Sequence, residues 1–395
     1  MTLSSHPTPA GLFSGEPFLS ASEELVYMSW LERTDESDPA LGHDLKLSTW
    51  DGSDWSEPVT VQQSDAFFVN WADFPSVRPG PGRTLWAHWL ERGAAGGYDY
   101  GVRVVHSRDG GATWSTPWTP HDDDSPTEHG FVSMVSDAER VGLVWLDGRN
   151  FVDGPDGTTA TREMTLRYRT AGADVEPGAE TLLDGRVCDC CQTSAAMTSS
   201  GPLVVYRDRS PDEIRDIYVA RMVDGHWTEG TAVHDDGWYI EGCPVNGPSV
   251  AASGDDVAVA WFTGAADTAR VKIAFSGDAG ATFSPPVVVD DGDPSGRVDV
   301  SLRSDGSALV TWLERVPVED DPESTRAEVR LRRVHPGGTA SESRVLSAST
   351  ADRASGFPRL VETPDGSYLL AWTDASQEWA RVHVTQFTLE DEDGS

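Results

Sequence analysis

The chain has little lysine, few cysteines and no long apolar run, and each shortage excludes a class of protein. Lysine occurs only as Lys46 and Lys272 among 30 basic residues, which face 65 acidic residues at a formal net charge of −35. A chain this acidic offers no basic patch to nucleic acid or to an anionic membrane. No stretch of 18 apolar residues occurs, so we expect no membrane span.

Targeting signals and helical patterns are scarce as well. Residues 1–15 lack the basic and apolar regions of a secretory signal peptide. The compartment therefore stays open: cytoplasmic, or extracytoplasmic with a leader removed. Helical periodicity is almost absent, whereas Gly and Pro punctuate the whole chain, which indicates an all-β protein. We expect one domain over residues 1–389 and a disordered acidic tail over residues 390–395.

An apolar segment with an aromatic residue at its centre recurs along the chain. The central residues are 51 to 61 positions apart. They are Trp30, Trp89, Trp145, Tyr206, Trp261, Trp312 and Trp372. Repeats of this length that hold several short strands are typical of β-propellers. Aromatic side chains at these positions can pack between neighbouring blades, which accounts for much of the tryptophan content.

Each repeat divides into four short strands, and seven repeats predict a seven-bladed propeller. The innermost strand begins the repeat, the aromatic strand is second, and two further strands follow, as at 74–77, 85–90, 102–106 and 286–289. The seventh repeat begins near Gly356 and lacks its fourth strand. We expect residues 3–13 to supply this strand and close the ring. Six blades are the alternative, but they would leave one complete set of strands unused.

Two turns between the third and fourth strands share a second motif. Residues 107–114 read S-R-D-G-G-A-T-W and residues 276–283 read S-G-D-A-G-A-T-F, both of the form S-x-D-x-G-x-T-aromatic. Asp and Ser or Thr side chains satisfy turn amides, and Gly permits positive φ. This motif resembles the Asp-box, or BNR repeat, of the sialidase-like propeller superfamily. The resemblance covers the whole chain, and it implies the fold more than any one reaction.

Counting back from each central aromatic places one residue at the start of every innermost strand. Cys191 lies 15 residues before Tyr206, and Cys243 lies 18 before Trp261. Residues in this place line the mouth of the central channel on one axial face. The ring comprises Glu16, Asp73, His129, Cys191, Cys243 and Arg297, with Arg353 near the seventh place. The cysteines and His129 should therefore converge beside the axis.

The four cysteines form the main candidate site. Three lie in Cys188-Asp189-Cys190-Cys191, and the fourth is Cys243. Thiolates near an imidazole suit Cu(I) or Zn(II), and the C-x-C-C spacing, unlike the C-x-x-C of zinc knuckles, favours copper. We predict a metal site of Cys188, Cys190, Cys191, Cys243 and His129.

Strand alternation limits how these cysteines can share one ion. It should direct Cys190 and Cys191 to opposite faces unless the chain leaves β geometry. We therefore expect Cys191 and Cys243 as the principal ligands, with at most three sulfurs on one ion. Two alternatives remain open: disulfides, either between Cys190 and Cys191 or from Cys188 to Cys243 as a clasp between blades, and four free thiols.

The family resemblance also implies a catalytic set that the chain matches poorly. Sialidases hold the substrate carboxylate with three arginines, and they use a Tyr–Glu nucleophile pair and an Asp acid/base. Here Arg297 and Arg353 are near the channel mouth, but Glu16 stands where the first-strand arginine is expected. Candidates for the remaining roles are Tyr239, Glu241 and Asp73.

Three functions remain in view. The first is a copper-dependent enzyme or a copper-handling protein, with zinc as the alternative metal. The second is an exo-sialidase-like glycoside hydrolase that uses carboxylates among Glu16, Asp73, Glu128 and Glu241. The third is a non-catalytic binding propeller with interblade disulfides. We expect a small molecule or a peptide as partner at the axial face, and the residues determine neither the substrate nor the oligomeric state.

Overall fold

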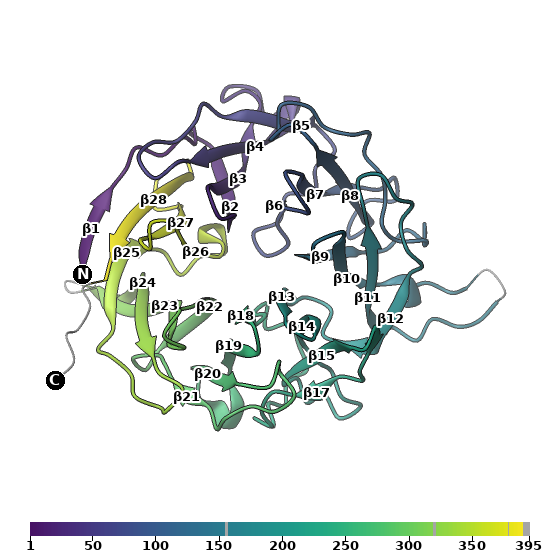
Figure 1. Cartoon of the computed structure of the whole chain (residues 1–395). Helices are drawn as coiled ribbons and strands as arrows, with labels where there is room; N and C mark the ends of the chain where they lie inside the picture. Colours follow the sequence, from purple (N-terminus) through teal and green to yellow (C-terminus); the bar gives the residue numbers. More distant parts are fainter. Residues whose placement is uncertain (155–156, 319–320, 378, 390–395) are drawn as a thin grey trace.

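The computed structural model describes residues 1–154, 157–318, 321–377 and 379–389, and it is a ring of seven antiparallel sheets (Figure 1). Each sheet is one blade. The predicted all-β propeller with seven blades is confirmed, and the predicted acidic tail at 390–395 lies outside the described residues. Helical structure in the described part is confined to the 3-10 turns η1 (Pro39–Leu41), η2 (Arg149–Phe151), η3 (Ala265–Asp267) and η4 (Arg353–Ser355).

Innermost strands, one from each blade, surround the axis. They are β2 (Ser14–Ala21), β6 (Ser76–Pro79), β9 (His129–Ser136), β13 (Ser194–Thr198), β18 (Ser249–Ser253), β22 (Pro294–Leu302) and β26 (Arg359–Glu362). The second strands contain the repeated aromatics. They are β3 (Val26–Arg33), β7 (Leu85–Arg92), β10 (Val141–Asp147), β14 (Gly201–Arg207), β19 (Asp256–Thr263), β23 (Ala308–Val318) and β27 (Tyr368–Asp374).

The two outer positions complete the blades. Third strands are β4 (His43–Trp50), β8 (Tyr100–Ser107), β11 (Met164–Ala171), β15 (Ile217–Val223), β20 (Arg270–Ser276), β24 (Asp321–Val334) and β28 (Arg381–Thr388). Fourth strands are β5 (Val59–Ser64), β12 (Thr181–Val187), β16 (His226–Trp227) with β17 (Thr231–Ala232), β21 (Val287–Val288), β25 (Arg344–Ser349) and β1 (Thr2–Ser5). In the second blade a single bridge between Val104 and Trp118 takes the fourth place.

The ring closes through the first strand of the chain. Residues Thr2–Ser5 of β1 pair with residues Thr385–Thr388 of β28, so the N-terminus supplies the outer strand of the last blade (Figure 1). This closure was predicted from the missing strand of the seventh repeat. It leaves the last blade with four paired strands, in the order β1-β28-β27-β26.

Aromatic side chains of the second strands fill the spaces between blades. Trp312 of β23 is fully buried in one hydrophobic cluster with Ala258 of β19 and Ile273 of β20, which belong to the preceding blade. Trp261 shares a cluster with Leu203 and Val205 of β14 in the same way. The tryptophans therefore hold neighbouring blades together, as the sequence pattern predicted.

The two turns with the S-x-D-x-G-x-T motif have matching hydrogen bonds. Ser107 donates to Asp109, and the carboxylate of Asp109 accepts bonds from the amide and hydroxyl groups of Thr113. Ser276, Asp278 and Thr282 repeat this pattern. These bonds lower the pKa of both aspartates to about 2, because they stabilise the charged carboxylate.

A left-handed residue marks the start of several innermost strands. Glu16, Phe131, Val245 and Arg297 have φ of 53°, 51°, 50° and 56°. Positive φ is uncommon for residues other than glycine, and three of these positions coincide with register shifts between the first and second strands. If the left-handed residue is taken as the reference position of each blade, Glu16 and Arg297 are equivalent to Phe131 and Val245. His129 and Cys243 lie two residues before these reference positions. Counting back from the central aromatics does not detect this offset.

No helix in the described part of the chain is long and apolar enough to cross a membrane.

Candidate functional site

Three cysteines meet in the connection between two blades. The chain leaves outer strand β12 at Val187, turns at Asp189 and Cys190, and enters innermost strand β13 at Ser194. The amide of Cys188 donates to the carbonyl of Arg207, which fixes the start of the turn. Because this segment is not a strand, alternation does not separate Cys190 from Cys191.

The sulfurs of this turn form a compact group. The Sγ atom of Cys188 lies 3.8 Å from that of Cys190 and 3.7 Å from that of Cys191. All three sulfurs lie within 4.8 Å of one another. Cys188 and Cys191 are buried, Cys190 is half-buried, and all four cysteines are free thiols. Cys188, Cys190 and Cys191 therefore converge as expected. They do so because the segment is a turn, whereas a regular strand would direct Cys190 and Cys191 to opposite faces.

Cys243 joins this group from the next blade, but only through Cys190. It lies in the segment before β18 and is exposed. Its Sγ atom is 3.9 Å from Oδ1 of Asp189, and Asp189, Cys190 and Cys243 form a second group of ligand atoms within 4.8 Å. Cys191 and Cys243, the expected principal pair, thus belong to different groups that share Cys190.

Two buried arginines accompany the sulfurs. Nη1 of Arg215 lies 3.3 Å from Sγ of Cys188 and 3.5 Å from Oδ1 of Asp189. The guanidinium of Arg207 donates to the backbone carbonyls of Asn246, Arg215 and Phe262, and it lies 4.8 Å from the ring centre of Trp238. Both arginines are almost fully buried. They supply positive charge where thiolates would otherwise be buried without compensation.

Hydrogen bonds among the thiols make the cysteines unequal. Bonds from Cys190 and Cys191, and then the charges of Arg207 and Arg215, hold the pKa of Cys188 well below its ordinary value. The same bond to Cys188 raises the pKa of Cys190, and burial raises the pKa of Cys191. The bond from Cys190 lowers the pKa of Cys243. Cys188 is therefore the sulfur best prepared to be a thiolate.

One of the two arginines breaks the repeat pattern. After the central aromatic, most repeats have an apolar residue such as Leu31, Leu90 or Leu146, but the fourth repeat has Arg207. A buried arginine in that place breaks the pattern and marks the blade. No comparable signal precedes Arg215, because its approach to Cys188 depends on the conformation of the connection between β14 and β15.

His129 is placed apart from the sulfurs. Its Nε2 lies 3.0 Å from Oδ2 of Asp123, its Nδ1 lies 3.2 Å from the carbonyl of Thr127, and its ring stacks on His121 at 4.0 Å. Asp123, His129 and Asp147 form a separate group of ligand atoms. Asp147 in that group is already paired with Arg149 at 2.7 Å.

The neighbouring residue Glu128 belongs to the environment of the cysteines instead. Burial, and then the charges of Asp189, Asp73 and Cys243, raise the pKa of Glu128 to about 8. Successive side chains point to opposite sides of extended backbone, which explains why Glu128 rather than His129 is coupled to this site. The role of His129 as a ligand stays a prediction, and in this structure both of its ring nitrogens have other partners.

Two of the candidate catalytic residues are held by structural contacts. Asp73 is buried and accepts hydrogen bonds from the amide of Phe131 at 2.7 Å and the hydroxyl of Tyr100 at 2.9 Å, while burial raises its pKa to about 7. Arg297 donates to Ser355 and to the carbonyls of Asp352 and Gly356, and its guanidinium lies over the ring of Trp71.

The remaining candidates lie in different surroundings. Tyr239 donates to the carboxylate of Glu241, and both residues are exposed in the segment before Cys243. Glu16 is part of β2, where burial raises its pKa to about 7. The described structure therefore joins Tyr239 to Glu241, but Asp73 and Arg297 have their polar groups occupied by the scaffold.

Comparison with known proteins finds similarity of structure only. No protein-family model matches the chain, and no curated protein matches its sequence. Solved structures similar to it include a protein of unknown function from Dyadobacter fermentans (14% identity, 95% of each chain, TM-score 0.47). They also include an ulvan lyase of a polysaccharide lyase family (12% identity, 80% of this chain and 78% of that one, TM-score 0.47). A sialidase from Streptococcus pneumoniae is 13% identical over 96% of this chain and 68% of its own, with a TM-score of 0.44. Identities this low say nothing about the reaction.

Proposed function

We propose that the protein binds a soft metal ion, Cu(I) in first place and Zn(II) in second, through the thiolates of Cys188, Cys190 and Cys191. The carrying observation is that these three sulfurs lie within 4.8 Å of one another as free thiols. A single ion between them would replace sulfur–sulfur contacts by metal–sulfur bonds. Thiolate ligands select copper(I) and zinc among the metals of proteins.

The two buried arginines offset part of the negative charge that the thiolates would carry. Three thiolates around Cu(I) keep a net negative charge, and a buried negative group needs compensation. Arg215 lies 3.3 Å from Cys188, and the guanidinium of Arg207 also lowers the pKa of that thiol. Zinc would call for a fourth ligand, which would have to come from Asp189 or Cys243.

The depth of the sulfurs favours copper handling over catalysis. Cys188 and Cys191 are buried, whereas Cys243 is exposed and reaches the group through Cys190. An ion held by the three sulfurs of the turn leaves little room for a substrate, so storage or transfer suits the site best. Cys243 and Asp189 then form the outer donor pair through which an ion enters and leaves.

Metal analysis of the reduced protein tests this proposal. The protein, purified without chelator, is expected to contain copper or zinc, or to take up Cu(I) from a chromogenic Cu(I) chelate. Arg215→Gln serves as a variant that keeps every sulfur, and it should weaken Cu(I) binding by roughly 10- to 100-fold, as loss of outer-sphere partners does elsewhere. Arg108→Gln, which removes the same charge at an exposed site, should bind as the unmodified protein does.

Two results would favour the alternative functions. A protein that takes up no metal and shows a mass deficit of two or four hydrogens relative to its reduced form contains disulfides, as the clasp alternative requires. Hydrolysis of a fluorogenic glycoside that is lost in Glu241→Gln would support the glycoside hydrolase alternative, because Tyr239 and Glu241 are hydrogen-bonded.

A further inference from the structure

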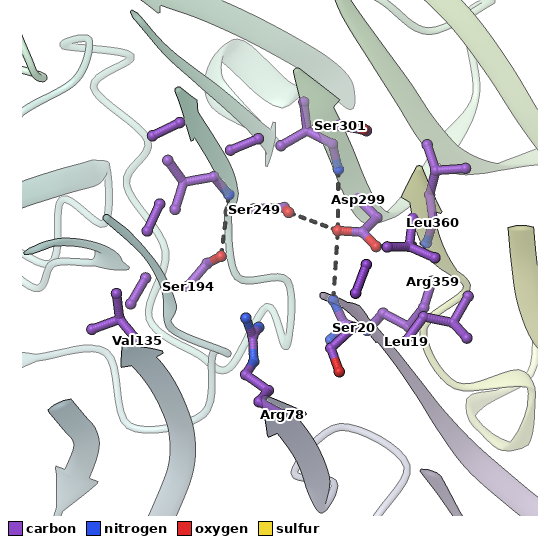
Figure 2. A pocket seen from close by; sticks show the side chains of 18 of the residues that line it. Leu19, Ser20, Arg78, Val135, Ser194, Ser249, Asp299, Ser301, Arg359 and Leu360 are labelled. Atoms are coloured by element: carbon purple, nitrogen blue, oxygen red, sulfur yellow. Dashed lines mark hydrogen bonds and ion pairs between the residues drawn. The ribbon is translucent and has the colours of Figure 1, made fainter. Parts of the chain in front are cut away.

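The centre of the ring contains a cavity that is separate from the cysteines. It has a volume of about 480 Å³ and is lined by innermost strands of all seven blades (Figure 2). Its lining runs along these strands to the last residues of several of them, such as Ala21, Pro79 and Glu362. The cysteines precede the first residues of β13 and β18. The cavity therefore extends toward the axial face opposite the cysteines.

Aromatic rings close the cavity on the side of the cysteines. Phe74 and Phe357 precede the strands β6 and β26, and their ring centres are 5.8 Å apart. The guanidinium of Arg359 lies 4.6 Å from the ring centre of Phe74 and 5.2 Å from that of Phe18. Phe18 and Phe74 of this aromatic layer also line a smaller pocket that reaches Gln192 and Thr193. Among the described residues no cysteine lines either pocket, so a ligand of the channel need not touch the sulfurs.

Arg78 reaches into the cavity, and no hydrogen bond joins its Nε to any described residue. Figure 2 shows its side chain extending from β6 toward the middle of the pocket, with no interaction drawn to it. Its Nε is buried and unbonded, and among the described residues no carboxylate lies within ion-pair distance of its guanidinium. The guanidinium of Arg78 lies over the ring of Phe18, 4.7 Å from the ring centre. This is unusual in a chain with 65 acidic residues and 30 basic ones.

Arg359 adds a second positive charge to the same cavity. Its Nε is also buried and unbonded, and its Nη1 lies 3.7 Å from Oδ1 of Asp299. That carboxylate is already occupied, because it accepts bonds from the hydroxyl of Ser249 and the amide of Leu360, each at 2.8 Å. Burial and the charge of Arg359 lower the pKa of Arg78 to about 10. Even so, Arg78 is a cation at neutral pH.

We propose that this channel binds a small oxyanion, the carboxylate or phosphate group of a small molecule, between the guanidinium groups of Arg78 and Arg359. Guanidinium forks bind such groups through paired, charge-assisted hydrogen bonds. Ser194 also lines the cavity; it accepts a bond from the amide of Val250 and retains its hydroxyl hydrogen for a ligand. The volume is in the range of small-molecule sites, about 300–1,000 Å³.

Thermal unfolding and calorimetric titration with defined anions test the site. Sodium phosphate, sulfate and acetate are compared with chloride at constant ionic strength. At least one oxyanion should raise the melting temperature above that in chloride and bind with measurable heat. Preference for phosphate and sulfate would identify a phosphoryl or sulfuryl ligand, and preference for acetate would identify a carboxylate.

Variants locate the binding to Arg78. Arg78→Gln should weaken the preferred anion by roughly 10- to 100-fold, the value of a lost charged hydrogen-bond pair. The control is Arg83→Gln, which makes the same charge change at an exposed residue between β6 and β7 and should bind as the unmodified protein does. If Arg78→Gln does not fold, Arg78→Lys keeps the charge but loses the fork, and it should still bind more weakly.

Either of two results would overturn the proposal. One is that no oxyanion stabilises the unmodified protein more than chloride does. The other is that Arg78→Gln or Arg78→Lys binds the anion as tightly as Arg83→Gln. The titration is repeated in Cys191→Ser, where unchanged anion binding is expected because no cysteine among the described residues lines the channel.

Discussion

At the scale of single residues, Cys188 has the most unusual surroundings in the described structure. Its sulfur is in contact with the sulfurs of Cys190 and Cys191 and accepts a hydrogen bond from the guanidinium of Arg215. This arrangement stabilises a thiolate before any ion arrives, so less reorganisation is needed on binding. Cys243 lacks this support, because it is exposed and close to the acidic Asp189.

The four cysteines should therefore contribute unequally to metal affinity. Replacing Cys188, Cys190 or Cys191 by Ser should abolish tight Cu(I) binding, because each removes one of the three sulfurs that would share the ion in the proposed site. Cys243→Ser should retain the ion and change mainly its rate of exchange. Competition with a Cu(I) chelator measures the affinity, and stopped-flow transfer measures the rate. Loss of affinity in Cys243→Ser equal to that in Cys191→Ser would show that both groups hold one ion.

A buried histidine in the second blade should make stability depend on pH. His88 is fully buried, and its Nδ1 lies 3.0 Å from Oγ of Ser76. Burial lowers its pKa from 6.5 to about 3. The unfolded chain therefore binds this proton first, and the stability that neutral His88 supplies above pH 6.5 is lost as the pH falls toward 3.

Urea unfolding at pH 4 and pH 7 measures this contribution, which is on the order of 4 kcal/mol over the full range. Burial raises the pKa of Asp73 and Glu16 to about 7. These two groups have the opposite effect on the protein: the stability that their neutral forms supply is lost as the pH rises from about 4 to 7. The comparison of the unmodified protein with His88→Gln isolates the histidine. Equal pH dependence in both proteins would contradict its assignment as a buried neutral group.

At the scale of elements, the blades could be predicted because each repeat has its own signal. The central aromatics locate the second strands, and the S-x-D-x-G-x-T turns locate the connection to the fourth. The shape of the segment from Cys188 to Thr193 could not be predicted, since it leaves β geometry only at the crossing between blades. Counting residues also could not see the left-handed bulges at Glu16 and Arg297.

Contacts between elements explain which features of the candidate site could not be predicted from the sequence. The grouping of three cysteines was visible in the chain, and propeller register correctly brought Cys243 near them. The separation of His129 and the approach of Arg215 depend on side-chain directions and on the connection between β14 and β15, which carry no periodic signal. A site made by crossing segments is therefore harder to predict than the strands that support it.

Packing of the second-strand aromatics between blades should be a main source of the protein's stability. Trp312 is fully buried between blades, and its Nε1 donates to Glu314 at 2.6 Å. Trp312→Ala should lower the free energy of unfolding by about 3–5 kcal/mol, because it leaves a cavity and removes one of the hydrogen bonds to the Glu314 carboxylate. Urea denaturation measures the loss. Trp379→Ala, at a residue that is 42% exposed, is the matched control and should cost much less.

At the scale of the whole molecule, the ring depends on a strand from the far end of the chain. Four residue pairs join β1 to β28, and His6 is hydrogen-bonded to Gln386 at 2.8 Å. A propeller without this strand has an open outer edge in its last blade, and open edges pair with other chains. Closure therefore affects both stability and the tendency to associate.

Removal of residues 1–6 should open the ring without disturbing the cysteines, which lie in other blades. The loss of four paired residues should cost on the order of 2–4 kcal/mol and lower the melting temperature. A synthetic peptide of residues 1–13, added in trans, should restore part of this loss because it can pair with β28 again, whereas a scrambled peptide of the same composition should not. Calorimetry with and without each peptide measures the effect. If the truncated protein melts at the temperature of the full chain, then the packed tryptophans between blades close the ring and the β1–β28 ladder is not required.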